Sequence, residues 1–228
     1  MTDDRISGIA LIAGSIASII TMSLHPTGHD LLTPGRFQDM ERLAKAVHAL
    51  ALLSLPIFFF GAYGLSRRLK ANSQLALAAL VTYGFALVAV MNAAVCSGLI
   101  APSVASRMLD ANAVNGDLWR ALFRFTGDMN QAFALVFVMA ASCAIVFWSV
   151  AIFRSKVMPQ WLARYGCVIA PVTMLAVGSG HIRLDVHGFG AIVLGQAIWF
   201  VGAGIGLCKA EAPIPDSPTP TSEVPVIP

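Results

Sequence analysis

The sequence predicts an all-α protein, a bundle of six transmembrane helices with both termini in the cytoplasm. Six long apolar runs are the first observation, and each is close to the ~20 residues that a helix needs to cross a bilayer. Only 12% of the 228 residues are charged, against about 25% in a typical soluble domain. These charges lie almost entirely between the apolar runs, which are Ser7–Leu24, Ala44–Leu65, Leu75–Ala101, Asp128–Phe153, Trp161–Gly180 and Gly188–Cys208.

The first three runs carry local signals for how their helices pack, bend or end. Small residues at Ala10, Gly14 and Ser18 would let another helix approach the first run closely. Pro26 ends that run, because the residue before a proline avoids the helical conformation. Pro56 stands in the middle of the second run and predicts a kink. The third run is long, so its helix is expected to tilt or to project beyond the bilayer.

Two polar connections are expected to carry short helices on the membrane surface. The first covers residues 36–43, before the second run. The second covers residues 102–127, where apolar and charged residues alternate at the spacing typical of helices that lie in the plane of the interface. Asn112, Asn115 and Gly116 are expected to interrupt this second connection, because such residues favour turns.

The last run and the segment after it differ sharply in composition. Gly202 and Gly206 have the spacing of a close helix–helix contact, which would also allow a helix-mediated homo- or hetero-oligomer. From Glu211 onward prolines are frequent, and such a segment cannot bury enough apolar surface to fold. The chain is therefore divided into a six-helix transmembrane domain, residues 1–210, and a Pro-rich, disordered cytoplasmic tail, residues 211–228.

Clusters of basic residues predict the orientation of the chain. They follow the second and the fourth runs, in loops without acidic residues, and comprise Arg67, Arg68, Lys70, Arg154, Lys156 and Arg164. Such clusters stay in the cytoplasm during insertion, which places both termini there. The net charge of +3 forms no basic patch interleaved with aromatic residues, so nucleic-acid binding is not expected.

The hairpin between the fourth and fifth runs has a distinctive pattern. In residues 151–171 a span ends in an aromatic residue, an Arg-Ser-Lys turn follows, and Pro-x-Trp-Leu-x-x-x-Gly opens the next span. This pattern resembles a group of uncharacterised bacterial six-span inner-membrane proteins that carry a domain of unknown function. The resemblance implies a multi-pass protein of the bacterial inner membrane and supports the number of spans. It implies no activity and no functional residues.

All five histidines fall on one predicted side of the membrane, the periplasmic side. They stand at the ends of the first, second, fifth and sixth runs, with Asp185 two residues before the last of them. Histidine and carboxylate together could bind Zn²⁺ or Cu²⁺, with the carboxylate as a ligand or as a group that orients a histidine. The candidate metal ligands are therefore His181, His187, Asp185, His25, His29 and His48.

The histidine layer is also compatible with roles that need no metal. The histidines could be ordinary interfacial residues with one end in water, or they could relay protons. Haem ligation is less expected, because the axial histidines of a buried haem usually lie inside the bilayer. The sequence contains no HExxH, Gly-x-Ser-x-Gly or P-loop motif that would identify a reaction.

The sequence thus favours an integral membrane protein of unknown activity that contacts the lipid bilayer. It is interpreted as a non-catalytic structural, sensory or accessory component whose periplasmic His/Asp layer binds a ligand or a metal. A metal-dependent membrane hydrolase built on that layer is one alternative. A small transporter is the other, and it requires a polar cavity that reaches the middle of the membrane around Asn92 and Gln196.

Overall fold

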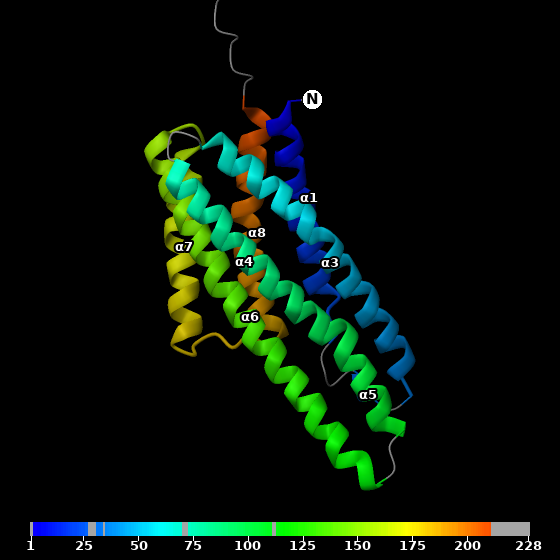
Figure 1. Cartoon of the computed structure of the whole chain (residues 1–228). Helices are drawn as coiled ribbons and strands as arrows, with labels where there is room; N and C mark the ends of the chain where they lie inside the picture. The colour runs from blue at the N-terminus through cyan, green and yellow to red at the C-terminus, as the bar shows by residue number, and fades with distance from the viewer. Residues whose placement is uncertain (1, 27–30, 34, 70–72, 111–112, 211–228) are drawn as a thin grey trace, which may run out of the picture.

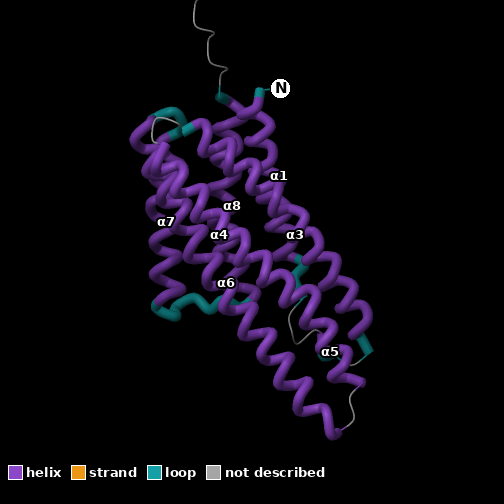
Figure 2. The backbone as a smooth tube through the Cα atoms, in the orientation of Figure 1, coloured by secondary structure: helices purple, strands orange, loops and turns teal. Residues whose placement is uncertain are grey.

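The computed structural model describes residues 2–26, 31–33, 35–69, 73–110 and 113–210, and within these ranges it is helical without strands. Figures 1 and 2 show a bundle of long helices that cross one another at shallow angles. The predicted tail, residues 211–228, lies outside the described residues. The elements are α1 Asp3–Ser23, α3 Phe37–Arg68, α4 Ser73–Val95, the π-helix η2 Cys96–Ile100, α5 Ala101–Asp110, α6 Ala113–Ser155, α7 Gln160–Gly178 and α8 Val186–Lys209.

Six of the described helical segments are long and apolar enough to cross a membrane, which confirms the prediction of an all-α protein with six spans. The third of these segments combines α4, η2 and α5 into one continuous rod. Large apolar side chains are exposed around the bundle, and Leu53, Phe85 and Leu175 are each about two-thirds exposed or more. A water-soluble protein does not expose apolar surface on this scale. The exposed side chains therefore contact the lipid bilayer.

The connection between the third and fourth spans differs from its prediction. The sequence predicts amphipathic helices lying flat on the membrane, but α5 continues α4 through η2, and α6 begins as early as Ala113. The apolar face of α5 is covered by α6 instead of by lipid headgroups: Ala105 is fully buried, and Arg107 stacks over the ring of Trp119. The expected interruption is wrong at Asn115 and Gly116, because both lie in the first turns of α6, whereas Asn112 lies outside the described residues.

The predicted surface helix at residues 36–43 is likewise part of a longer helix. Its residues form the first turns of α3, which runs without interruption from Phe37 to Arg68. Helices of this length exceed a bilayer: α6 has 43 residues, or about 65 Å at 1.5 Å per residue, against a hydrocarbon core of about 30 Å. In Figure 1, α5 and the start of α6 extend well past the ends of α1, α7 and α8. The long helices therefore project beyond the membrane at that end.

The centre of the bundle is held by stacked aromatic side chains. Trp148 of α6 and Trp199 of α8 are fully buried, with their rings stacked at 5.9 Å. Tyr83 and Phe200 pack edge-on against Trp148. Each indole N–H has a partner: Trp148 donates to Ser66 at 2.9 Å and Trp199 donates to Ser149 at 3.2 Å. The hydroxyls remove the cost of burying these N–H groups in a medium without water.

Small residues bring α1 and α8 into close contact. A Cβ atom added at Gly8 would lie 2.5 Å from the carbonyl oxygen of Gly204, so the two backbones touch directly. The close-contact face predicted at Gly202 and Gly206 packs against the start of the fifth span, where Trp161 and Met158 lie. Small-residue packing of this type replaces the hydrophobic effect as the driving force between helices in lipid.

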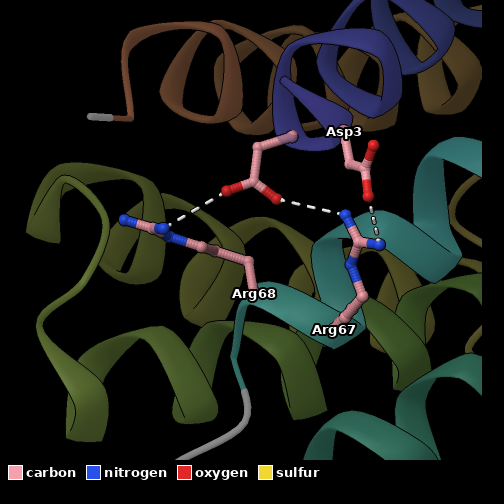
Figure 3. A network of polar contacts seen from close by, with 4 residues as sticks. Asp3, Arg67 and Arg68 are labelled. Carbon is pink, nitrogen blue, oxygen red and sulfur yellow. Dashed lines mark hydrogen bonds and ion pairs between the residues drawn. The ribbon is translucent and has the colours of Figure 1, made fainter. Parts of the chain in front are cut away.

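At the end of the bundle where α1 begins and α8 ends, ion pairs join α1 to α3 (Figure 3). Arg67 donates to Asp3 at 2.9 Å, and Arg68 donates to Asp4 at 3.2 Å. Arg67 also lies 3.6 Å from Asp4, whose side chain is only 19% exposed. The acidic N-terminus therefore lies directly on the basic end of the second span.

Candidate functional site

The four described histidines lie at the end of the bundle opposite to the termini. His25 follows the last turn of α1, His48 is in the fourth turn of α3, His181 follows α7, and His187 is in the first turn of α8. Residues 27–30, which include the predicted ligand His29, lie outside the described residues. The antiparallel order of the helices produces this one-sided arrangement, because α1 and α7 end, and α3 and α8 begin, toward the same end of the bundle (Figure 1).

Two of these histidines contact each other. The rings of His25 and His48 are 4.7 Å apart between centroids and meet edge to face at 69°. His48 is 3% exposed, and its Nδ1 lies 2.7 Å from the carbonyl oxygen of Ala44. A carbonyl oxygen only accepts hydrogen bonds, so Nδ1 of a neutral His48 carries the proton and Nε2 is left as an acceptor.

The π-helix η2 provides the wall against which His48 packs. A Cβ atom added at Gly98 would collide with Cβ and Cγ of His48, so a glycine is needed for the imidazole to lie this close to the backbone. The wider π turn also brings Cys96 and Ser97 to the same region. Single π-helical turns inside α-helices are frequent at functional sites.

A cavity of about 500 Å³, which we call the outer cavity, opens at this end of the bundle. Residues of α1, α3, α4, η2, α5, α6 and α8 line it, together with the segments that follow α1 and precede α8. His25, His48 and His187 are in its wall, and so are Asn130 and Gln131 of α6. The volume is within the ~300–1,000 Å³ that is usual for small-molecule sites.

Two polar atoms of the outer cavity are buried without a hydrogen-bond partner. They are Oγ1 of Thr21 and Nδ1 of His25. Burial also lowers the pKa of His25 below its usual 6.5, so its imidazole is neutral at pH 7. Buried polar atoms are normally paired, and an unpaired one costs about 1–3 kcal/mol. These two atoms therefore indicate the place where a ligand or water binds.

A second, smaller cavity of about 90 Å³, the inner cavity, lies deeper in the bundle. Its wall is mainly aromatic and aliphatic, with rings from Phe58, Phe137 and Phe200. Tyr83 and Gln196 also face it. The two cavities adjoin, because both are lined by Thr21, Met22, Ala51, Val90 and Phe189.

The predicted pair His181 and His187 is divided by the structure. His187 lines the outer cavity, whereas His181 does not, and its Nδ1 lies 2.8 Å from the hydroxyl of Ser179. Asp185 lines the cavity as well, but its Oδ1 accepts hydrogen bonds from the backbone N–H groups of His187 and Gly188. Asp185 thus has a clear structural role as the N-cap of α8.

The metal assignment stays a prediction. Across the part of the chain that the structure describes, no three histidine, cysteine or acidic side chains come together in a way that could hold a metal ion. The closest approach to the predicted set is the pair His25 and His48, with His187 elsewhere in the same wall. Two imidazoles supply half of the four ligands that a structural zinc site uses.

The polar path expected of a transporter is only partly present. Gln196 is buried at the inner cavity and donates weakly to Ser142 at 3.4 Å. Asn92, the other expected group, lines neither cavity, and its amide donates to the carbonyl of Val88 at 2.8 Å. The Asn92 amide is therefore hydrogen-bonded within its own helix and does not extend a polar pathway through the membrane.

Several site residues carry no clear signal in the sequence. Thr21 and Cys96 resemble ordinary small residues of a span, and the π turn that makes Gly98 a contact for His48 has no sequence signature. In the sequence, Asn130 is explained equally well as a residue that forms hydrogen bonds between helices, although in the structure it lines the outer cavity. One usable signal is present, since Thr21 precedes His25 by four residues and so lies near the same end of the first run.

Comparison with known proteins adds no assignment. The chain matches no protein-family model, no curated protein and no solved structure. The resemblance seen in residues 151–171 stays a prediction. Function therefore has to be inferred from the cavities and their side chains.

Proposed function

We propose that this chain is a non-catalytic sensory or accessory protein of the bacterial inner membrane that binds a small ligand in the outer cavity. The observation that carries the proposal is the outer cavity itself, about 500 Å³ in volume and lined by residues of seven helical elements. A cavity of this size with a few polar groups among apolar ones is typical of ligand sites. The unpaired atoms of Thr21 and His25 give a ligand something to bind.

The side chains of the cavity support binding more than catalysis. A catalytic metal site uses three convergent protein ligands, and a carboxylate acts as a general base only where it is free to take up a proton. Asp185 is engaged in capping α8, and the contact between His25 and His48 is through ring edges. These groups suit recognition of a ligand by hydrogen bonding.

The test is the identity of the small molecules that copurify with the protein. Wild-type protein extracted in mild detergent should carry a compound that mass spectrometry detects, and Ala51→Phe should lose it, because Ala51 lines both cavities. Ala132→Phe is the matched control, since Ala132 is exposed on α6 and faces neither cavity. Equal retention in the two variants would contradict ligand binding in the cavity.

The orientation of the site is part of the proposal. The outer cavity faces the periplasm if the basic clusters that follow α3 and α6 stay in the cytoplasm. Arg67 and Arg68 lie at the same end of the bundle as the N-terminus, where they pair with Asp3 and Asp4. A periplasmic opening would expose the site to compounds that enter from outside the cell.

Binding of Zn²⁺ or Cu²⁺, including use in a metal-dependent hydrolase, is the second candidate. It is favoured by the hydrogen bond from Nδ1 of His48 to Ala44, which fixes the ring and leaves Nε2 free, as in metal-bound histidines. Elemental analysis of the purified protein tests it. The metal should be present in wild type and lost in His48→Ala, and absence of any transition metal from wild type would exclude this candidate.

A further inference from the structure

The partnerless Oγ1 of Thr21 marks the junction of the two cavities. Thr21 is 8% exposed and is among the residues that line both spaces. Nδ1 of His25, on the outer side of this junction, is also without a partner. A ligand that lies at the junction can satisfy both atoms and extend in two directions, outward past the histidines and inward among the aromatic rings.

The inner direction is suited to a hydrocarbon chain. The rings of Phe58, Tyr83 and Phe200 pack against one another at centroid distances of 5.2–6.4 Å and line this space. Apolar cavities of this kind stay dry and bind hydrocarbons. The part of the ligand that lies beyond Thr21 is therefore apolar.

The outer direction is suited to a head group without charge. None of the described residues that line the outer cavity is a lysine or arginine, and Oδ1 of Asp185, the carboxylate in its wall, accepts hydrogen bonds from the start of α8. An anionic head would be removed from water without an opposite charge, which is costly.

A hydroxyl is the group that satisfies both unpaired atoms. It donates one hydrogen bond and accepts others, so it can pair with an imidazole nitrogen and with the hydroxyl of Thr21 together. We propose that the ligand is a neutral lipid with a hydroxyl-bearing head, of the monoacylglycerol or long-chain alcohol class. Its head lies at Thr21 and His25, and the start of its chain enters the inner cavity. This assignment depends on the proposed function, ligand binding in the outer cavity.

Photolabelling of the full-length protein in lipid nanodiscs tests the assignment. The probes are a monoacylglycerol and a fatty acid that carry the same diazirine-bearing chain, so that only the head differs. The monoacylglycerol should label α1, α3 and α8 at the cavity wall several times more strongly than the fatty acid. Equal labelling, or stronger labelling by the fatty acid, would overturn the neutral head.

Variants at Thr21 test the hydrogen bond itself. Thr21→Val keeps the shape of the side chain and should lower monoacylglycerol labelling about threefold to tenfold, the equivalent of one hydrogen bond. Thr21→Ser keeps the hydroxyl and should retain wild-type labelling. Thr173→Val is the matched control, because Thr173 is buried on α7 and lines neither cavity. If Thr21→Val labels as well as Thr173→Val, the assignment is wrong.

The two proposals can fail separately. If Ala51→Phe removes a copurified water-soluble compound and neither lipid probe labels the wall, ligand binding stands and the lipid assignment is overturned. If no compound copurifies and no probe labels the wall, both proposals are overturned. Labelling by the monoacylglycerol that Ala51→Phe abolishes supports both.

Discussion

At the residue scale, the position of His48 is decided by a residue on another element. Gly98 has no side chain, and the imidazole of His48 occupies the space where a Cβ atom would be. The hydrogen bond from His48 to Ala44 then fixes the ring in that place. The position of His48 therefore depends on η2 as well, because the π turn places Gly98 opposite the imidazole.

Gly98→Ala should destabilise the protein. The added methyl group collides with His48 at a buried contact, and overpacking of this kind costs about 1–3 kcal/mol. Thermal unfolding in detergent should show a lower midpoint than wild type. Gly84→Ala is the control, because the nearest atom to its added Cβ is 3.8 Å away on Phe59. The packing argument fails if the two variants have the same midpoint.

The stability of the protein should depend on pH through His25. Burial lowers the pKa of this imidazole below 6.5, the value in an unfolded chain. Below pH 6.5 the unfolded state therefore takes up a proton before the folded state does, so the free energy of unfolding falls as pH falls, until the folded pKa is reached. Above pH 6.5 the effect is absent.

The measurement is the midpoint of thermal unfolding between pH 7.5 and pH 5. Wild type should lose stability over this window, and His25→Asn should lose less. His48, whose ring contacts His25, remains in the variant, so the contribution of His25 is the difference between the two curves. Parallel curves would show that His25 is not the group responsible.

At the element scale, contacts between backbones decide which helices are neighbours. α1 lies between α3 and α8, and its contact with α8 is a direct approach of Gly8 to Gly204. Contact between neighbouring helices also explains the position of α5, whose apolar face packs against α6 and not against the membrane surface. An amphipathic sequence specifies that one face is covered, and the neighbouring helix determines what covers it.

Gly204→Ala should weaken the packing of α1 against α8. Its added Cβ would lie 2.7 Å from the carbonyl oxygen of Gly8, and a backbone atom cannot move aside as a side chain can. We expect a loss of about 1–3 kcal/mol in unfolding by detergent denaturation. Gly190→Ala on the same helix is the control, since its added Cβ has only the flexible end of Met22 at 3.8 Å. Similar losses in both would mean that any α8 glycine is equally sensitive.

At the scale of the whole molecule, the two ends of the bundle differ because the helices have unequal lengths. The end with the termini is closed by the ion pairs of Asp3 and Asp4 with Arg67 and Arg68 (Figure 3). At the opposite end, α5 and α6 project past the shorter helices, and the outer cavity lies there. We therefore attribute the outer cavity to unequal helix lengths.

A reporter fused after Ala212 tests the direction of this asymmetry. The basic clusters predict that the C-terminus is cytoplasmic. A reporter that functions only in the cytoplasm should therefore be active when fused there, and a reporter that functions only in the periplasm should be inactive. A fusion within the projecting end, between Asp110 and Ala113, is the opposite control. Activity of the periplasmic reporter after Ala212 would invert every side assignment, including that of the cavity.

The amino-acid sequence by itself determined the fold class, the number of spans and the one-sided position of the described histidines. These follow from the length of each apolar run and from the reversal of chain direction between successive spans. Both can be read from the sequence, because each run must be long enough to cross a bilayer of fixed thickness. The sequence also located Pro26 just past the end of α1 and the close contacts of Gly202 and Gly206 on α8.

Only the tertiary structure decided which of these residues form a site. In the structure, His25 contacts His48 and His181 lies outside the cavity wall. Asp185 caps the start of α8. The structure also leaves Thr21 without a partner at the junction of two cavities. The physical reason is that cavities arise where helices of different length and crossing direction fail to fill space together, and that depends on all of the helices at once.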